Sequence, residues 1–284
     1  MTRPLDETET VVGLAGDWHG NRLWAKHSLA QLADSGVTTL FHLGDLGIWP
    51  GPRGRQFMSE LDESCRGHGI TIYLTPGNHE DYDQINELPI LDDGLQWLTE
   101  HVAVIPRGHR WTMAGRTFVS LGGAPSIDFP QRIEGETWWP AEAITDDDVD
   151  RVVAGGYADI MLAHDAPAPS TPSVNRIVGS DGGWTERGLA YAAVGRVRMT
   201  RAFTGVGPSV FVHGHYHVQD EATLPLTESG RSCQVVSLNC DGVAGNLALL
   251  DLDDWTAVDD EGKPGISHRW LKDAYETSST IPLK

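Results

Sequence analysis

Apolar and β-branched runs alternate with longer amphipathic stretches over the first hundred residues of the chain. The runs TVVGLAG (10–16), VTTLFHLG (37–44) and ITIYLTPG (70–77) have the length and composition of buried strands. Two segments with helical patterning, residues 21–36 and 54–66, separate them. Short apolar strands joined by helices are typical of a parallel sheet that is covered on both faces. The pattern therefore predicts βαβ units in this part of the chain.

The pattern changes after residue 100. Residues 101–123 predict short strands that turn at Gly108 and Gly115, and an acidic helix start follows at Thr145–Asp148. Further along we expect a strand over 157–165, a Gly-, Ser- and Pro-rich loop over 166–183 and a helix over Trp184–Phe203. Three more strands are expected over 208–214, 232–240 and 246–254. No linker divides the chain. We therefore expect one domain over residues 1–272, with two packed sheets and outer helices, and a C-terminal tail over residues 273–284.

Composition and charge exclude several classes of function. The chain has 21 Lys and Arg against 40 Asp and Glu, a net charge of −19, and no basic cluster, so long nucleic acid is not an expected partner. No apolar run reaches the roughly 18 residues of a membrane span, and the acidic N-terminus lacks the features of a secretory signal. Three cysteines without a C-x-x-C motif favour reduced thiols and a cytoplasmic location. The oligomeric state stays open.

Potential metal ligands follow five of the predicted strands directly. The strand ends read Asp17-Trp18-His19-Gly20-Asn21, Gly44-Asp45, Gly77-Asn78-His79-Glu80, His164-Asp165 and Gly214-His215-Tyr216-His217. Sites in α/β proteins form where the carboxyl ends of parallel strands meet. The sequence therefore predicts a metal site at this edge of the sheets.

These segments together resemble a known family. In order, GDWHGN, LGDLG, PGNHE, LAHD and HGHYH resemble the motifs D-x-H, G-D, G-N-H-(D/E), H and G-H-x-H of the calcineurin-like metallophosphoesterase superfamily, over roughly residues 11–250. The resemblance implies an α/β fold, a four-layer α/β/β/α sandwich, with a dinuclear metal centre. It assigns the first ion to Asp17, His19, Asp45 and His217. It assigns the second ion to Asp45, Asn78, His164 and His215.

The residue types suit this chemistry on independent grounds. The carboxylate of Asp45 has two oxygens and can bridge two ions, which an imidazole cannot do. Mixed nitrogen and oxygen ligands favour Mn, Fe, Co, Ni or Zn over Mg or Ca, and we expect two such ions, with Mn the first choice. With a bridging hydroxide the centre would carry a charge of about +1, which attracts a phosphate.

The resemblance also implies a division of roles at the reacting phosphate. The metal-bridging hydroxide attacks phosphorus, and His79 lies near the leaving-group oxygen, where it donates a proton or stabilises charge. Asp45 and His79 are therefore the expected catalytic residues. The expected substrate contacts are Asn78, Arg132, Trp138 and Trp139. The two tryptophans either form the wall of a pocket for an aromatic ring or hold their loop against the core, and both interpretations stay open.

The sequence also departs from one branch of the superfamily. Ser/Thr protein phosphatases carry G-D-x-V-D-R-G, where this chain reads GDLGIWPG, and Pro76 stands where they have an arginine before G-N-H-E. A protein phosphatase is therefore not expected. The partner that orients His79 stays open, with Glu80 as a candidate. The GHYH ending is more similar to phosphodiesterase branches, and the segment around GGAPSID to compact bacterial and phage members. His213 and Asp165 fall outside the ligand set, as structural or orienting groups.

These features favour a dinuclear metal-dependent phosphoesterase that hydrolyses small phosphodiesters, with cyclic nucleotides among the candidates. The alternative within this class is a phosphomonoesterase that acts on small phosphate esters. A non-catalytic interaction module on the same fold ranks lower, because such members tend to lose ligands that are present here. A nuclease that acts on long DNA or RNA ranks lower because of the charge of −19.

Overall fold

Two sheets form the centre of the protein. The computed structural model describes residues 5, 7–180, 182–226, 230–256 and 265–271, so the expected tail over 273–284 lies outside the described residues. The first sheet has seven strands in the order β13-β12-β1-β2-β3-β5-β4. Their bounds are β1 Val11–Ala15, β2 Thr39–His42, β3 Thr71–Leu74, β4 Gln96–Trp97, β5 Val102–Val104, β12 Leu247–Thr256 and β13 Gly265–Trp270.

The second sheet has six strands in the order β10-β11-β9-β8-β7-β6. Their bounds are β6 Arg110–Met113, β7 Arg116–Leu121, β8 Ile160–Ala163, β9 Val210–His213, β10 Asp220–Leu226 and β11 Arg231–Ser237. In each sheet four neighbouring strands run parallel, namely β1, β2, β3 and β5 in the first and β7, β8, β9 and β11 in the second. The predicted parallel arrangement is confirmed.

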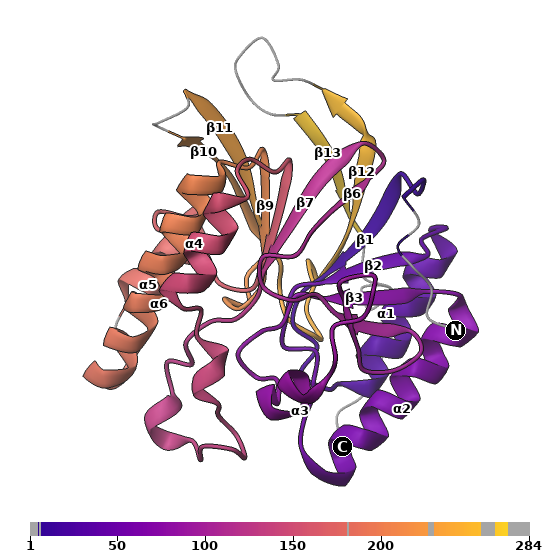
Figure 1. Ribbon diagram of the computed structural model, residues 1–284, viewed down its shortest axis with the longest axis horizontal. Coiled ribbons are helices and arrows are strands. Elements are labelled where there is room, and N and C mark those ends of the chain that lie inside the picture. The colour runs from indigo at the N-terminus through magenta and orange to yellow at the C-terminus, as the bar shows by residue number, and fades with distance from the viewer. Residues whose placement is uncertain (1–4, 6, 181, 227–229, 257–264, 272–284) are drawn as a thin grey trace, which may run out of the picture.

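Helices cover the outer face of each sheet (Figure 1). The helices are α1 Arg22–Asp34, α2 Gly51–His68, α3 Tyr82–Glu87, α4 Asp146–Ala154, α5 Pro172–Gly179 and α6 Glu186–Val206, with 3-10 turns η1 Phe129–Gln131 and η2 Pro140–Glu142. One apolar cluster packs α1 and α2 on the first sheet, a second joins the two sheets, and a third packs α4 and α6 on the second sheet. The predicted four-layer sandwich is confirmed. None of the described helices is both long and apolar enough to cross a membrane.

Local sequence signals account for the helix starts. Thr145 and Asp148 form the reciprocal pair of a capping box at the start of α4, so the acidic start predicted there is confirmed. Asn21 caps α1 by accepting the backbone N–H of Trp24. The predicted loop over 166–183 is wrong in part, because it contains α5, whose start is capped by Thr171. Helix α3 and strands β10 and β13 are also additions to the predicted elements.

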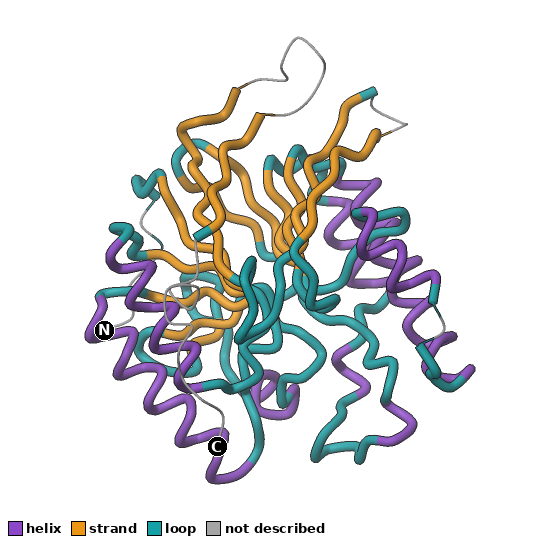
Figure 2. Tube along the Cα trace, turned by 180° about the vertical axis from the view of Figure 1, so that it is seen from behind, coloured by secondary structure: helices purple, strands orange, loops and turns teal. Residues whose placement is uncertain are grey.

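The loops that follow the parallel strands gather at one end of the sheets, between the two helical layers (Figure 2). The carboxyl ends of β1, β2 and β3 point the same way because these strands are parallel neighbours. The same holds for β8 and β9 in the second sheet. All five predicted ligand segments follow these strands, so the fold delivers them to one place.

Candidate metal centre

The first predicted ligand set is a compact cluster. Asp17, His19, Asp45 and His217 each offer a ligand atom, and these atoms all lie within 4.8 Å of one another. His217 Nε2 is 2.9 Å from Asp17 Oδ2, and His19 Nε2 is 3.7 Å from Asp45 Oδ2. Two carboxylates and two imidazoles at this spacing match the donor set of a borderline divalent cation. The residues present therefore fit a metal ion.

The second predicted set lies on the other side of Asp45. His164 Nε2 is 2.9 Å from Asn78 Oδ1 and 3.4 Å from Asp45 Oδ1. The rings of His164 and His215 have their centroids 5.0 Å apart. Asp45 thus turns Oδ2 toward the first set and Oδ1 toward the second. This is the placement that a bridging carboxylate requires.

The electrostatics of the cluster call for positive charge. Asp17 and Asp45 are buried. Burial lowers the pKa of His19, but the carboxylates of Asp45, Asp17 and Asp241 outweigh it and raise that pKa to about 10. Burial likewise raises the pKa of Asp45, but His164, His79 and His19 outweigh it, and the pKa lies well below its usual range. Divalent cations would supply the charge that protonated imidazoles otherwise provide.

The backbone at four of the predicted ligands is strained. Five non-glycine residues among the described ones have positive φ, and four of them are predicted ligands: His19 (45°), Asp45 (53°), His215 (70°) and His217 (49°). A side chain in the left-handed region costs free energy and is found mainly where function demands it. These positions are therefore held by the surrounding loops for the placement of their side chains.

Two strand-end glycines leave room for the carboxylates. A Cβ on Gly77 would lie 2.2 Å from Asp45 Oδ1, and a Cβ on Gly214 would lie 2.3 Å from Asp17 Oδ1. Both distances are far below van der Waals contact. Glycine at these positions therefore allows the loops to close around Asp45 and Asp17.

Asp241, which the sequence analysis did not identify, supports the first ligand set. Its Oδ1 is 2.9 Å from His19 Nδ1, and its Oδ2 accepts a hydrogen bond from Asn21 Nδ2 at 2.7 Å. A carboxylate on the second ring nitrogen fixes the tautomer and the orientation of a ligating histidine. Asp241 directly follows the segment predicted as the strand 232–240, so the rule that found the other residues could have found it too.

A second unpredicted group orients Asn78. The Nδ2 atom of Asn78 donates to Ser126 Oγ at 2.9 Å, and Ser126 Oγ donates to Glu142 Oε2 at 2.7 Å. Glu142 is buried and also accepts the backbone N–H of Ser126 and the indole N–H of Trp138. Burial raises the pKa of Glu142 to about 7 despite these bonds. The chain from Asn78 to Glu142 keeps the amide oxygen of Asn78 directed at His164.

Glu80, the candidate partner of His79, contacts other groups instead. The carboxylate of Glu80 is buried and accepts backbone N–H groups of the two neighbouring ligand loops, from Asp45, Gly47 and Gly77. Arg132 instead lies against His79, with Nη1 2.8 Å from Nδ1 and Nη2 3.1 Å from Nε2. Asp128 accepts Arg132 Nε at 2.7 Å. Glu80 therefore braces the ligand loops, and Arg132 is the group that contacts His79.

The two expected wall tryptophans point elsewhere. Trp138 donates to Glu142 and packs near Phe129 and Tyr191. Trp139 is buried and donates to Asp83 at 2.9 Å. Neither residue lines the cavity beside the predicted ligands. Both contacts agree with the interpretation in which the two tryptophans hold their loop in place.

The residues expected outside the ligand set also have defined places. His213 is fully buried, its Nδ1 lies 2.9 Å from the carbonyl oxygen of Gly214, and burial lowers its pKa to about 4. Asp165 accepts the hydroxyl of Tyr216 at 2.8 Å. Both residues therefore support the loops behind the ligands.

A cavity of about 300 Å³ opens above the ligands. Its floor is polar and consists of Asp45, Asn78, His79, His215 and His217. The lining also includes apolar residues from α5, α6 and the connection between them. The other lining residues are Ile127, Asp128, Arg132, Ser180, Arg196 and Tyr216.

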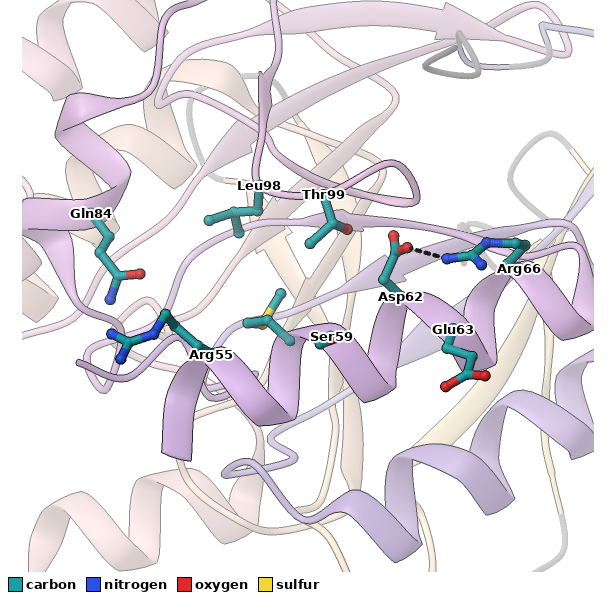
Figure 3. A pocket seen from close by; sticks show the side chains of 9 residues that line it. Arg55, Ser59, Asp62, Glu63, Arg66, Gln84, Leu98 and Thr99 are labelled. Carbon is teal, nitrogen blue, oxygen red and sulfur yellow. Dashed lines mark hydrogen bonds and ion pairs between the residues drawn. The ribbon is translucent and has the colours of Figure 1, made fainter. Parts of the chain in front are cut away.

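A larger cavity of about 570 Å³ lies along α2 and shares no lining residue with the first (Figure 3). There Asp62 is paired with Arg66 at 3.0 Å and accepts the backbone N–H of His101 at 2.9 Å. Histidine does not line it, so the smaller cavity is the one that offers the chemistry of a metal site.

Comparison with known proteins supports the fold and identifies the family. A structure titled a dimetal phosphatase, from Danio rerio, is similar with a TM-score of 0.53 at 11% identity, covering 88% of this chain and 93% of that one. The TT1561 protein of Thermus thermophilus is similar with a TM-score of 0.50 at 13% identity, covering 87% and 96%. No curated protein sequence matches. A family model, calcineurin-like phosphoesterase, matches residues 10–219, most of the chain, and the chain therefore belongs to that family.

Proposed function

We propose that this protein is a dinuclear metal-dependent phosphoesterase that hydrolyses small phosphodiesters. The observation that carries the proposal is the position of Asp45, whose two carboxylate oxygens face two separate groups of ligand atoms. Asp17, His19 and His217 would hold one ion with Asp45. Asn78, His164 and His215 would hold the other. The proposed ions are divalent transition metals. Mn is the first choice, and Fe, Zn, Co and Ni are the alternatives.

The ions would supply an activated water and bind the phosphate oxygens. The protein places the remaining groups around that phosphate. His79 is 30% exposed and faces the cavity, with Nε2 3.8 Å from Asp45 Oδ2. It is therefore positioned to donate a proton to, or stabilise charge on, a leaving-group oxygen bound above Asp45. Arg132 contacts His79 and lines the same cavity, where its guanidinium adds positive charge near a bound phosphate.

The shape of the cavity favours diesters. Beyond the ligands it continues along an apolar surface, which gives a second ester group a place to bind. A phosphomonoesterase is the second candidate, and Arg132 is the feature that favours it, because an additional positive charge suits a dianionic monoester. The cysteines Cys65, Cys233 and Cys240 are all free, which supports the proposed cytoplasmic location.

One paired measurement tests the proposal. Metal content per chain is determined on protein purified without chelator, and the same samples are assayed with Mn for hydrolysis of bis(p-nitrophenyl) phosphate and p-nitrophenyl phosphate. We expect about two metal ions per chain and faster cleavage of the diester. Faster cleavage of the monoester would support the second candidate. Metal without turnover of either ester, across several divalent ions, would overturn the enzyme proposal in favour of an interaction module.

A further inference from the structure

One side of the cavity is apolar and comes from helices rather than strand ends. Ile177 and Val178 lie on α5, Trp184 lies in the connection that follows, and Leu189 and Ala192 lie on α6. We call these five residues the α5–α6 wall. It lies beside a floor made of one carboxylate, one amide and three imidazoles. The proposed chemistry at phosphorus does not require such a wall.

The wall leaves large apolar surfaces open to the cavity. Trp184 is 44% exposed and Ile177 is 43% exposed, so both rank among the exposed large hydrophobic residues of the described chain. Exposed apolar surface has a cost in water, and where it adjoins a polar site it commonly marks a ligand surface. Two such residues at the edge of a metal site therefore point to an apolar part of the ligand.

Two glycines on one face of α6 bring the wall to the site. A Cβ on Gly188 would lie 1.9 Å from the carbonyl oxygen of Ile127, and a Cβ on Gly195 would lie 2.3 Å from Pro125 Cδ. The two positions are seven residues apart and therefore share a helix face. α6 thus packs directly on the loop that carries Ser126, the residue that orients Asn78. The distance between wall and floor is consequently set by this contact.

The size and chemistry of the cavity define what fits. Its volume of about 300 Å³ is at the lower end for ligand sites, which range from about 300 to 1,000 Å³. The space therefore suits a phosphate and a group of one ring system rather than a long chain. The indole of Trp184 and the guanidinium of Arg196 both offer flat faces, which stack on planar rings. Arg196 lies close enough to Tyr216 for its positive charge to oppose the burial that raises the pKa of the Tyr216 hydroxyl.

We infer that the site selects phosphodiesters in which the ester group that stays on phosphorus is aromatic, and that this ring binds on the α5–α6 wall against Trp184. The inference rests on the proposed function and adds the substrate class to it. The leaving group stays on the side of His79, and the retained ring lies over the wall. Hydrogen-bonding groups are scarce on the wall, so the ring is recognised by its shape and apolar surface.

The test uses three diesters that share p-nitrophenolate as leaving group and carry methyl, n-hexyl or phenyl as the second ester group. Intrinsic reactivity differs among them, so ratios of kcat/KM are compared between variants, in which that difference cancels. Trp184→Ala should lower the phenyl-to-methyl ratio by about tenfold, the value expected for losing the burial of one ring face. Trp184→Phe should keep the ratio within about threefold, because it retains a ring.

Val197→Ala is the matched control, since Val197 lies on α6 and is 69% exposed outside the cavity. Its ratio should equal that of the wild type. A ratio unchanged in Trp184→Ala would overturn the inference. An n-hexyl ester that loses as much as the phenyl ester in Trp184→Ala would overturn the selection of aromatic groups.

Binding separates this inference from the proposed function. Equilibrium dialysis on the Mn-loaded protein compares phenylphosphonate with methylphosphonate, which needs no turnover. We expect the phenyl compound to bind about tenfold more tightly in the wild type and to lose most of that advantage in Trp184→Ala. If no ester is turned over but the phenyl compound still binds more tightly, the proposed reaction is rejected and the inference that the wall binds an aromatic ring is retained. Equal binding of both phosphonates would reject the inference that the wall binds an aromatic ring.

Discussion

The floor and the α5–α6 wall enclose one cavity but are built in different ways. The floor consists of polar side chains at strand ends, on backbone forced into the left-handed region at His215, His217 and Asp45. The wall consists of apolar side chains on two helices and the connection between them, and it reaches the site through a glycine contact between α6 and a loop. Reaction and substrate preference are therefore assigned to separate elements, and substitutions should be able to change one without the other.

The largest effect is expected for Asp45→Ala on the floor. Loss of the shared carboxylate removes a ligand from both proposed ions, so kcat/KM should fall at least about a thousandfold. Metal content, measured on the same preparation, should fall with it. Circular dichroism controls for folding. An Asp45→Ala protein that keeps about two ions and its activity would show that Asp45 does not bridge.

His79→Ala should affect rate without affecting metal. We expect kcat to fall about a hundredfold with the metal content of the wild type, because the imidazole is assigned to the leaving group and not to an ion. The loss should be larger for an alkoxide leaving group than for p-nitrophenolate, which needs less protonation. Full activity with the alkoxide leaving group would rule out the assigned role.

Ser126→Ala tests the support beneath the floor. The substitution removes the acceptor of the Asn78 amide N–H, and loss of such a supporting group typically weakens metal binding by about 10- to 100-fold. Titration of the metal-free protein with Mn measures this. Ser28→Ala is the control, because Ser28 is equally buried and its hydroxyl has no partner among the described residues. Equal affinities in both variants would contradict the orienting role.

Gly188→Ala displaces the wall and has the smallest expected effect on turnover. The added methyl group meets the Ile127 carbonyl oxygen, so α6 must shift, at a cost of about 1 to 3 kcal/mol in the free energy of unfolding. The phenyl-to-methyl ratio should fall while metal content is retained. Gly67→Ala on α2 is the control, since no atom lies within 4 Å of the new Cβ. A ratio that survives Gly188→Ala would mean that the wall tolerates a displaced α6.

The same contrast explains what the sequence could predict. Ligands that directly follow apolar strands are local features, so the positions of Asp17, His164 and His217 could be inferred from residue order. Ser126 and Glu142 lie in a long loop, and their contact with Asn78 depends on how that loop folds back. Trp184 was placed in a helix and not in a site, because its approach depends on α6 packing over a distant segment.

Secondary structure shows a similar limit. Buried strands such as β8 were predicted because an uninterrupted apolar run has few other interpretations. Strand β10 was missed because it is an edge strand in which exposed and partly buried residues alternate and Pro225 interrupts the pattern. Helix α5 was missed because it is short and lies within a segment rich in proline, serine and glycine.

The left-handed backbone at the ligands has a consequence for directed evolution. Glycine at His217 would relieve a steric cost of about 1 kcal/mol, so His217→Gly should melt at a higher temperature than the wild type when both are held in chelator. In excess Mn the order should reverse, because the wild type gains more stability from bound ions than a variant that lacks one ligand of the first ion. A library screened for heat resistance without metal would therefore enrich proteins that have lost their centre. The same library screened with metal would keep it.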